Sequence, residues 1–260
     1  MLTDSHCHLD KIKLDQFDDD FNNIISAATE ADVSRFLCVC IDLERFDDVH
    51  QIAQKYPQIY CSVGVHPTSE NVKEPSIDDL ITLAKSDRVI AIGETGLDYF
   101  RVSDEDRDME WQRERFRVHI HAAKKTQKPL IIHTRSAKDD TLKVLAEEGA
   151  DSVGGVMHCF AEDWETAQKS LALNFYISFS GIVTFNSAKE LQRVAQQVPE
   201  DRILIETDSP WLAPVPKRGK SNQPAYVKYV AEKVADLRGD TYENIAKISS
   251  DNFERLFKVS

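Results

Sequence analysis

Short apolar segments rich in β-branched and aromatic residues alternate along the chain with longer segments of helical periodicity. The first pattern is typical of buried strands and the second of helices that cover a sheet. Strands are expected at 1–3, 35–41, 59–65, 89–92, 130–133, 155–159, 175–179 and 202–205, and helices at 18–31, 44–55, 77–85, 108–126, 138–148, 163–172 and 187–197. Two or three further helices are expected between residues 224 and 257.

Eight alternations of strand and helix in 260 residues predict an α/β fold, a (β/α)8 TIM barrel with extra C-terminal helices. Residues 1–260 are expected to form a single domain, because no linker-like Gly/Ser or Pro tract precedes residue 212. A doubly wound open sheet is the competing architecture. It is disfavoured because no GxGxxG motif follows an early strand.

Side chains of metal-ligand type stand where several of these strands end. In a barrel, the C-terminal strand ends meet at one face, and active sites form there. His6 and His8 are two positions apart, so they should project from the same side of the first strand, with Cys7 turned toward the packed side. The other candidates follow strands three, four, five, six and eight: His66, Glu94, His133, His158 and Asp208.

Imidazoles and carboxylates in this number can bind two divalent ions. The expected assignment is His6, His8 and Asp208 for one ion, His133 and His158 for the other, and Glu94 as a bridge through its two oxygens. Two ions about 3.5–4 Å apart can activate a shared hydroxide and clamp a phosphoryl oxygen. A single ion, with the remaining histidines bonded to backbone carbonyls, is the alternative.

The charge balance limits the kind of substrate. The chain has 32 basic and 44 acidic side chains, a net charge of −12. Tight nonspecific coating of nucleic acid needs a broad positive surface and is therefore disfavoured. A phosphate-containing substrate is still compatible, because bound divalent cations reverse the local field.

The sequence also indicates the cellular compartment in which the protein is expected. No apolar stretch approaches the roughly 20 residues that cross a bilayer, and the N-terminus lacks the pattern of a signal peptide. We therefore expect a cytoplasmic protein without a membrane partner. Its five cysteines have no finger-like spacing, and reduced thiols are expected.

Eight motifs are spread over the chain in the order DSHCHLD (4–10), GVHP (64–67), IGETGLDY (92–99), IHTR (132–135), HCF (158–160), FYISFSGIVTF (175–185), ETDSPWLAP (206–214) and NQPAYV (222–227). Together they resemble the TatD family of metal-dependent deoxyribonucleases, a branch of the amidohydrolase-like TIM barrels. Related amidohydrolases commonly bridge their metals with a modified lysine. Glu94 stands in a GETG context instead, which points to the nuclease branch.

The resemblance implies a two-metal barrel hydrolase that cleaves DNA phosphodiester bonds with the six ligands given above. Mg²⁺ is the implied ion for activity, and the four histidines also suit Zn²⁺ or Mn²⁺. A barrel mouth accepts a single strand more easily than a duplex, so we expect an exonuclease that trims single-stranded ends. A 3′-5′ direction of digestion and a monomeric state are further expectations. Hydrolysis of another ester or amide, such as deacylation of aminoacyl-tRNA, is the alternative, and a non-catalytic metal-binding scaffold is a third possibility.

Further residues have expected roles in catalysis or substrate binding. Asp208 should accept a proton from the attacking water, with Glu94 between the ions. His66 could bond a phosphate oxygen, protonate the leaving group, or only cap its turn. Arg135 could make a forked contact with phosphate or form a salt bridge.

Three more positions complete these expectations. Tyr99 could shape the substrate cleft or serve packing. Asn222, in the proline-bounded loop 214–224, could hold the substrate backbone, or the loop could be an ordinary solvated one. Glu206 could orient a metal-bound histidine from behind.

Overall fold

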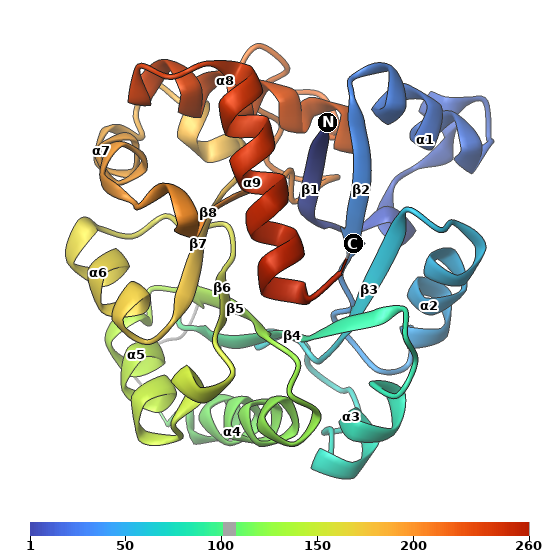
Figure 1. The fold of residues 1–260 in the computed structure, drawn as a ribbon. Coiled ribbons are helices and arrows are strands. Elements are labelled where there is room, and N and C mark those ends of the chain that lie inside the picture. The colour runs from blue at the N-terminus through green and yellow to red at the C-terminus, as the bar shows by residue number, and fades with distance from the viewer. Residues whose placement is uncertain (101–107, 260) are drawn as a thin grey trace.

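The computed structural model describes residues 1–100 and 108–259, which form a ring of parallel strands surrounded by helices (Figure 1). The sheet has eight strands in chain order, so each strand pairs with the next one along the sequence. The strands are β1 (Leu2–Cys7), β2 (Val33–Cys38), β3 (Ile59–Val63), β4 (Val89–Asp98), β5 (Leu130–Arg135), β6 (Gly155–Met157), β7 (Phe175–Phe179) and β8 (Ile203–Ile205). The prediction of a (β/α)8 TIM barrel is confirmed.

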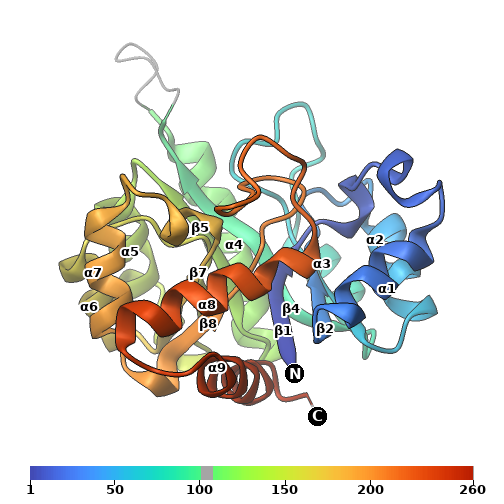
Figure 2. The same cartoon turned by 90° about the horizontal axis from the view of Figure 1, so that it is seen from above.

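Helices connect consecutive strands and lie outside the ring (Figure 2). They are α1 (Phe21–Glu30), α2 (Phe46–Lys55), α3 (Ile77–Leu83), α4 (Glu110–Thr126), α5 (Lys138–Glu147), α6 (Trp164–Ala172) and α7 (Lys189–Gln197), followed by α8 (Val227–Arg238) and α9 (Tyr242–Phe257). Local sequence sets their starts. Before α3, the Ser76 hydroxyl accepts the Asp79 N–H while the Asp79 carboxylate accepts the Ser76 N–H, which is a capping box.

Three strands run further than the apolar pattern predicts. β1 extends to Cys7, β4 to Asp98 and β5 to Arg135. Polar residues interrupt the apolar pattern at these points, but several of them face the barrel interior and bond to one another there. Glu94 therefore lies within β4 and His6 within β1.

The barrel closes between β1 and the segment after β8. The Asp208 N–H donates to the His6 carbonyl at 2.9 Å, and the His8 N–H donates to the Ser209 carbonyl at 2.8 Å. The backbone bonds that close the barrel therefore also bring the candidate ligands His6, His8 and Asp208 together.

The ring has an inner and an outer apolar layer. The outer layer packs the strands against the surrounding helices. The inner layer joins strand residues such as Ile131 and Val156 to Phe253, Leu256 and Phe257 of α9. Helix α9 thereby covers the end of the barrel where the strands begin, opposite the candidate site (Figures 1 and 2).

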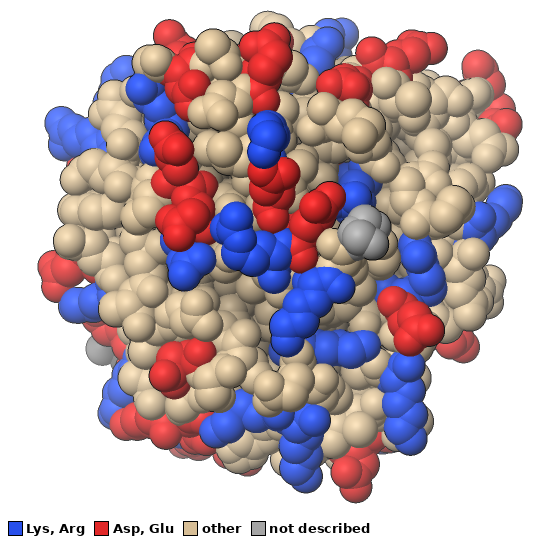
Figure 3. All heavy atoms as spheres, viewed as in Figure 1, with Lys and Arg blue, Asp and Glu red and all other residues tan. Residues whose placement is uncertain are grey.

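The face that carries α9 has basic and acidic side chains close together rather than a broad area of one sign (Figure 3). Among the described residues, no helix is both long and apolar enough to cross a membrane.

Candidate metal centre

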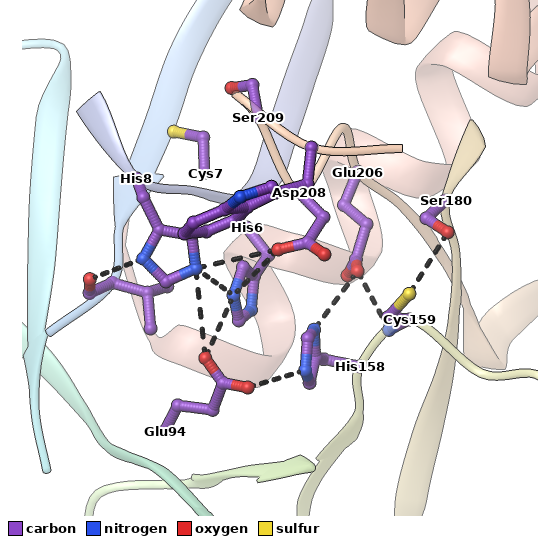
Figure 4. Close-up of polar contacts among 12 residues, drawn as sticks. His6, Cys7, His8, Glu94, His158, Cys159, Ser180, Glu206, Asp208 and Ser209 are labelled. Carbon is purple, nitrogen blue, oxygen red and sulfur yellow. Dashed lines mark hydrogen bonds and ion pairs between the residues drawn. The ribbon is translucent and has the colours of Figure 1, made fainter. Parts of the chain in front are cut away.

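The expected ligands converge at the C-terminal end of the barrel, where His8, Glu94, His133, His158 and Asp208 line a cavity of about 530 Å³. Figure 4 shows this convergence for His6, His8, Glu94, His158 and Asp208. His6 and His8 turn inward from β1 and its end, whereas Cys7 between them is fully buried in the outer layer, as alternation predicts. Among the described residues, three sets have ligand atoms within 4.8 Å of one another: His6, His8 and Asp208; His66, Glu94 and His133; His6, His158 and Glu206.

The first set closes around one point together with an oxygen of Glu94. His6 Nε2 is 3.2 Å from His8 Nε2, and Asp208 Oδ1 is 3.7 and 3.5 Å from these two nitrogens. Glu94 Oε2 lies 3.4 Å from His6 Nε2 and 3.8 Å from His8 Nε2. Ligands about 2.0–2.2 Å from a tetrahedral zinc ion are about 3.3–3.6 Å apart, so these four atoms fit a divalent cation.

The other oxygen of Glu94 faces a different group of histidines. Glu94 Oε1 is 2.8 Å from His158 Nε2, 3.2 Å from His133 Nδ1 and 3.3 Å from His66 Nε2. His66 Nε2 is in turn 3.3 Å from His133 Nδ1. Glu94 therefore stands between two groups of donor atoms, as its expected bridging role requires.

An irregularity in β4 aims Glu94 inward. Between Ile92 and Thr95 the strand advances three residues while β5 advances two, so one extra residue is inserted. Ile92 packs in the outer layer, and strict alternation would send Glu94 outward as well. The inserted residue reverses this direction, which is a common use of strand bulges near active sites.

The remote ring nitrogens of the histidines decide which atoms are free to bind a cation. His8 Nδ1 donates to the Val39 carbonyl at 3.1 Å, and His158 Nδ1 donates to Glu206 Oε1 at 3.2 Å. In both rings Nε2 therefore keeps its lone pair and faces the centre of the site. Partners of this kind fix the tautomer and orientation of metal-binding histidines.

His133 and His66 have opposite arrangements. His133 Nε2 donates to Asp98 Oδ2 at 2.9 Å, so the lone pair of its Nδ1 faces Glu94. His66 Nδ1 accepts the Thr68 N–H at 3.1 Å, so the hydrogen of His66 is on Nε2 and points into the site. His133 thus offers a ligand atom, whereas His66 offers a hydrogen-bond donor.

One buried nitrogen fits a cation that completes the site. His158 Nε2 has no hydrogen-bond partner among the described residues. Glu94 Oε1 is 2.8 Å from His158 Nε2, but the approach lacks hydrogen-bond geometry. A buried unpaired nitrogen is costly, and a divalent cation would satisfy it. The donor set therefore fits the metal ions that the sequence predicts.

The charges of the site are strongly coupled. Burial raises the pKa of Glu94, but the histidines around its carboxylate, His158 above all, outweigh this effect, so this pKa lies well below its usual range. Burial lowers the pKa of His158, yet Glu94 and Glu206 hold it well above the ordinary value, so a cation that binds Nε2 takes the place of a proton. Burial lowers the pKa of His66, which leaves that ring neutral at pH 7.

The structure brings some of the expected substrate-binding residues to this cavity and not others. Arg135 lines it from the end of β5. Tyr99 does not, because its hydroxyl donates to Asp140 at 3.0 Å and accepts from Arg113 at 3.0 Å, outside the cavity lining. Asn222 is buried, and its amide donates to the backbone carbonyls of Thr207 and Trp211.

Two residues of α4 that the sequence did not single out for the site hold the His66 loop. Arg115 donates to the His66 and Ser69 carbonyls at 2.8 and 3.0 Å and pairs with Glu74. His119 is fully buried and accepts the Val65 N–H on Nε2 at 2.9 Å. The sequence pattern predicts a helix here, but it carries no signal for bonds between this helix and the His66 loop.

The comparisons with known proteins agree with this geometry. A family model described as TatD related DNase matches residues 3–258. The chain belongs to the TatD family. It is similar to the metal-dependent hydrolase YcfH of Escherichia coli K12, with 46% identity over 99% of this chain and 96% of that protein.

Two further proteins place the chain in the same group. The metal-dependent hydrolase YabD of Bacillus subtilis is 41% identical over the full length of both chains. The crystal structure of YJJV, a TatD homologue from Escherichia coli K12, superposes with a TM-score of 0.90 at 26% identity, covering 100% of this chain and 98% of that one. The chain is thus a metal-dependent hydrolase of the TatD family.

Proposed function

We propose that this TatD-family hydrolase cleaves DNA phosphodiester bonds with two divalent ions, acting as a monomer on single-stranded ends in the 3′-5′ direction. The observation that carries the proposal is the position of Glu94. Its two oxygens face different groups of donor atoms, one with His6, His8 and Asp208 and the other with His133 and His158. All of these residues belong to one chain, which supports a monomer.

Divalent ions in such a pair supply a nucleophile at neutral pH and offset charge on the phosphoryl group. The residues of the chain supply the remaining steps. Burial raises the pKa of Asp208, but the neighbouring rings of His8, His6 and His158 outweigh this effect, so the pKa lies below its ordinary value and the carboxyl is ionised at neutral pH. Asp208 is therefore the group that accepts the proton of the attacking water.

His66 and Arg135 are placed to hold the phosphate. The Nε2 hydrogen of His66 points into the cavity, so the neutral ring donates to a phosphate oxygen rather than binding an ion. The Arg135 side chain is exposed at the mouth of the same cavity, where its guanidinium can contact phosphate in a forked geometry. Both roles need an anionic substrate.

The proposal is tested with 5′-labelled single-stranded and duplex oligonucleotides in the presence of Mg²⁺, Mn²⁺ or Zn²⁺. We expect a ladder that shortens from the 3′ end of the single strand. His158→Ala should abolish this ladder. His121→Ala should leave the ladder unchanged, because His121 is a half-exposed residue of α4 that pairs with Glu148.

The same preparations are then assayed against a panel of carboxylic esters and aminoacyl-tRNA. If DNA stays intact with all three ions while an ester or the tRNA is cleaved, the family hydrolase acts on another bond and the nuclease proposal fails.

A further inference from the structure

The mouth of the cavity carries a cluster of exposed aromatic side chains. Large apolar residues are seldom exposed among the described residues, and three of the five that are exposed lie here. Phe100 is 53%, Trp111 41% and Trp211 49% exposed. Single exposed apolar residues need no explanation, but a group of aromatics beside a candidate active site indicates a binding surface.

A second cavity of about 640 Å³ adjoins the first. Trp211, Arg135 and His66 line both cavities, whereas Phe100 and Trp111 line only the second. A ligand bound at the metal centre can therefore continue past Trp211 toward Phe100 and Trp111 without leaving the surface.

The position of Trp211 is fixed relative to the candidate ligands. The backbone N–H of Trp211 donates to the Asp208 carbonyl at 3.0 Å, and the backbone carbonyl of Trp211 accepts from the side-chain amide of Asn222. Its ring meets His8 edge to face, with the ring centroids 5.0 Å apart. The buried Asn222 thus holds the loop that presents Trp211.

The charge of the second cavity indicates what kind of group it accepts. Glu70 and Asp98 line it, and Arg135 is the sole Lys or Arg among the described residues of that lining. The Arg135 guanidinium lies 3.6 Å from the centre of the Phe100 ring, in a stacked arrangement. Two carboxylates disfavour phosphate groups there, while flat uncharged groups can stack on the exposed rings.

We propose that Trp211 stacks on the base next to the phosphodiester bond to be cleaved, and that Phe100 and Trp111 hold the following base of a single strand. This inference rests on the proposed nuclease function and names the part of the substrate that the mouth recognises. Stacking accepts every base, because each has a π-face, so binding is independent of sequence. A paired base in a duplex has both faces covered, which explains a preference for single strands.

Binding is measured by fluorescence anisotropy on the metal-loaded full chain, with labelled phosphorothioate-linked dT6 that resists hydrolysis. A strand of six abasic sugars, with the same linkages and charge, is the matched ligand. We expect dT6 to bind at least roughly tenfold more tightly than the abasic strand, since each stacked base contributes on the order of a tenfold factor. Trp211→Leu and Trp111→Leu should each remove most of this difference while the affinity for the abasic strand changes little.

Val215→Ala is the control, because Val215 is 45% exposed in the same loop but lines neither cavity. Equal affinity of the unsubstituted protein for both strands, or unchanged base preference in both leucine variants, would overturn the inference. The hydrolysis assay separates this outcome from failure of the proposed function. If DNA is cleaved but binding shows no preference for bases, the stacking inference fails and the nuclease proposal is retained. Base-dependent binding without any cleavage supports the stacking surface and refutes the nuclease.

Discussion

The Glu206 carboxylate holds His158 from the side opposite the metal centre. Glu206 Oε1 accepts from His158 Nδ1 at 3.2 Å and from the Cys159 N–H at 2.8 Å, and Oε2 accepts from the Ser178 hydroxyl. Glu206 and Ser178 are completely buried. The His158 ring is thereby fixed in the tautomer that presents the lone pair of Nε2 to Glu94 and to a bound cation.

Replacing Glu206 by Gln should weaken metal binding more than it affects the fold. The amide keeps the volume and one acceptor but loses the charge that makes the His158 ring a better ligand. Changes of this kind typically reduce metal affinity about 10- to 100-fold. The affinity is measured by titration calorimetry against a competing chelator, with Glu165→Gln, an exposed glutamate on α6 paired with Lys169, as the control. Unchanged affinity in a folded Glu206→Gln variant would show that His158 is not a ligand.

The paired substitution of His6 and His8 by Ala should remove one of the two expected ions and nearly all activity. The backbone bonds of His6 and His8 that close the barrel do not involve the imidazoles, so the fold should remain. Metal content is measured by atomic emission after dialysis, and the fold by circular dichroism. We expect about half of the metal that the unsubstituted protein binds. Full metal content would place the ion elsewhere, and complete loss would indicate a single shared ion.

The architecture and the placement of the candidate ligands at one end of the barrel were predictable because they depend on local pattern. Alternation within β1 was sufficient to separate His6 and His8 from Cys7. The direction of Glu94 was not predictable from alternation, since the inserted residue in β4 reverses it. The role of Glu94 was inferred from its position at the predicted end of the strand. In the structure, the inserted residue rather than regular alternation turns its side chain inward.

Contacts between distant segments were harder to predict. Nothing near Tyr99 in the sequence indicates that Asp140 and Arg113 bind its hydroxyl. The buried amide of Asn222 likewise bonds to carbonyls 15 and 11 residues earlier in the chain. The partners of Tyr99 become its neighbours only when α4 and α5 pack beside β4, whereas those of Asn222 depend on how the segment after β8 folds back on itself.

A buried network joins Asp4 of β1 to the segment after β8. Asp4 Oδ1 accepts the Thr207 N–H at 2.8 Å, and Oδ2 is 2.6 Å from Thr207 Oγ1. Thr207 Oγ1 also donates to Ser209 Oγ at 2.9 Å, and its single hydrogen cannot serve both contacts. Burial raises the pKa of Asp4 to about 8, which fits a neutral acid that donates to Thr207.

This assignment predicts different outcomes for two substitutions of Asp4. Asn can copy the neutral acid, with Oδ1 accepting from Thr207 N–H and Nδ2 donating to Thr207 Oγ1, so Asp4→Asn should change the free energy of unfolding by less than about 1 kcal/mol. Asp4→Ala leaves buried polar groups unpaired and should cost about 3 kcal/mol. Both values are obtained from urea unfolding at pH 7. A cost for Asn as large as that for Ala would mean that Asp4 is ionised in the folded protein.

The buried His119 ring should make the protein acid-sensitive below neutral pH. Burial lowers the pKa of His119 to about 4, outweighing the hydrogen bond from Nδ1 to the Arg115 carbonyl, which raises it. In the neutral ring, Nε2 accepts the Val65 N–H. In the unfolded chain the ring has its ordinary pKa of about 6.5. Between these two values the unfolded state binds the extra proton, so stability is present above pH 6.5 and is lost as the pH falls toward 4.

From pH 7 to pH 5 this residue alone should lower the free energy of unfolding by about 2 kcal/mol. His119→Gln is the matched variant, because the Gln amide can accept from Val65 and donate to Arg115 but does not titrate in this range. Urea unfolding of both proteins at pH 7 and pH 5 isolates the contribution of His119 from those of the other histidines. The decrease between the two pH values should be smaller by about 2 kcal/mol in His119→Gln. An equal decrease in both proteins would show that the His119 ring is already charged or accessible in the folded state.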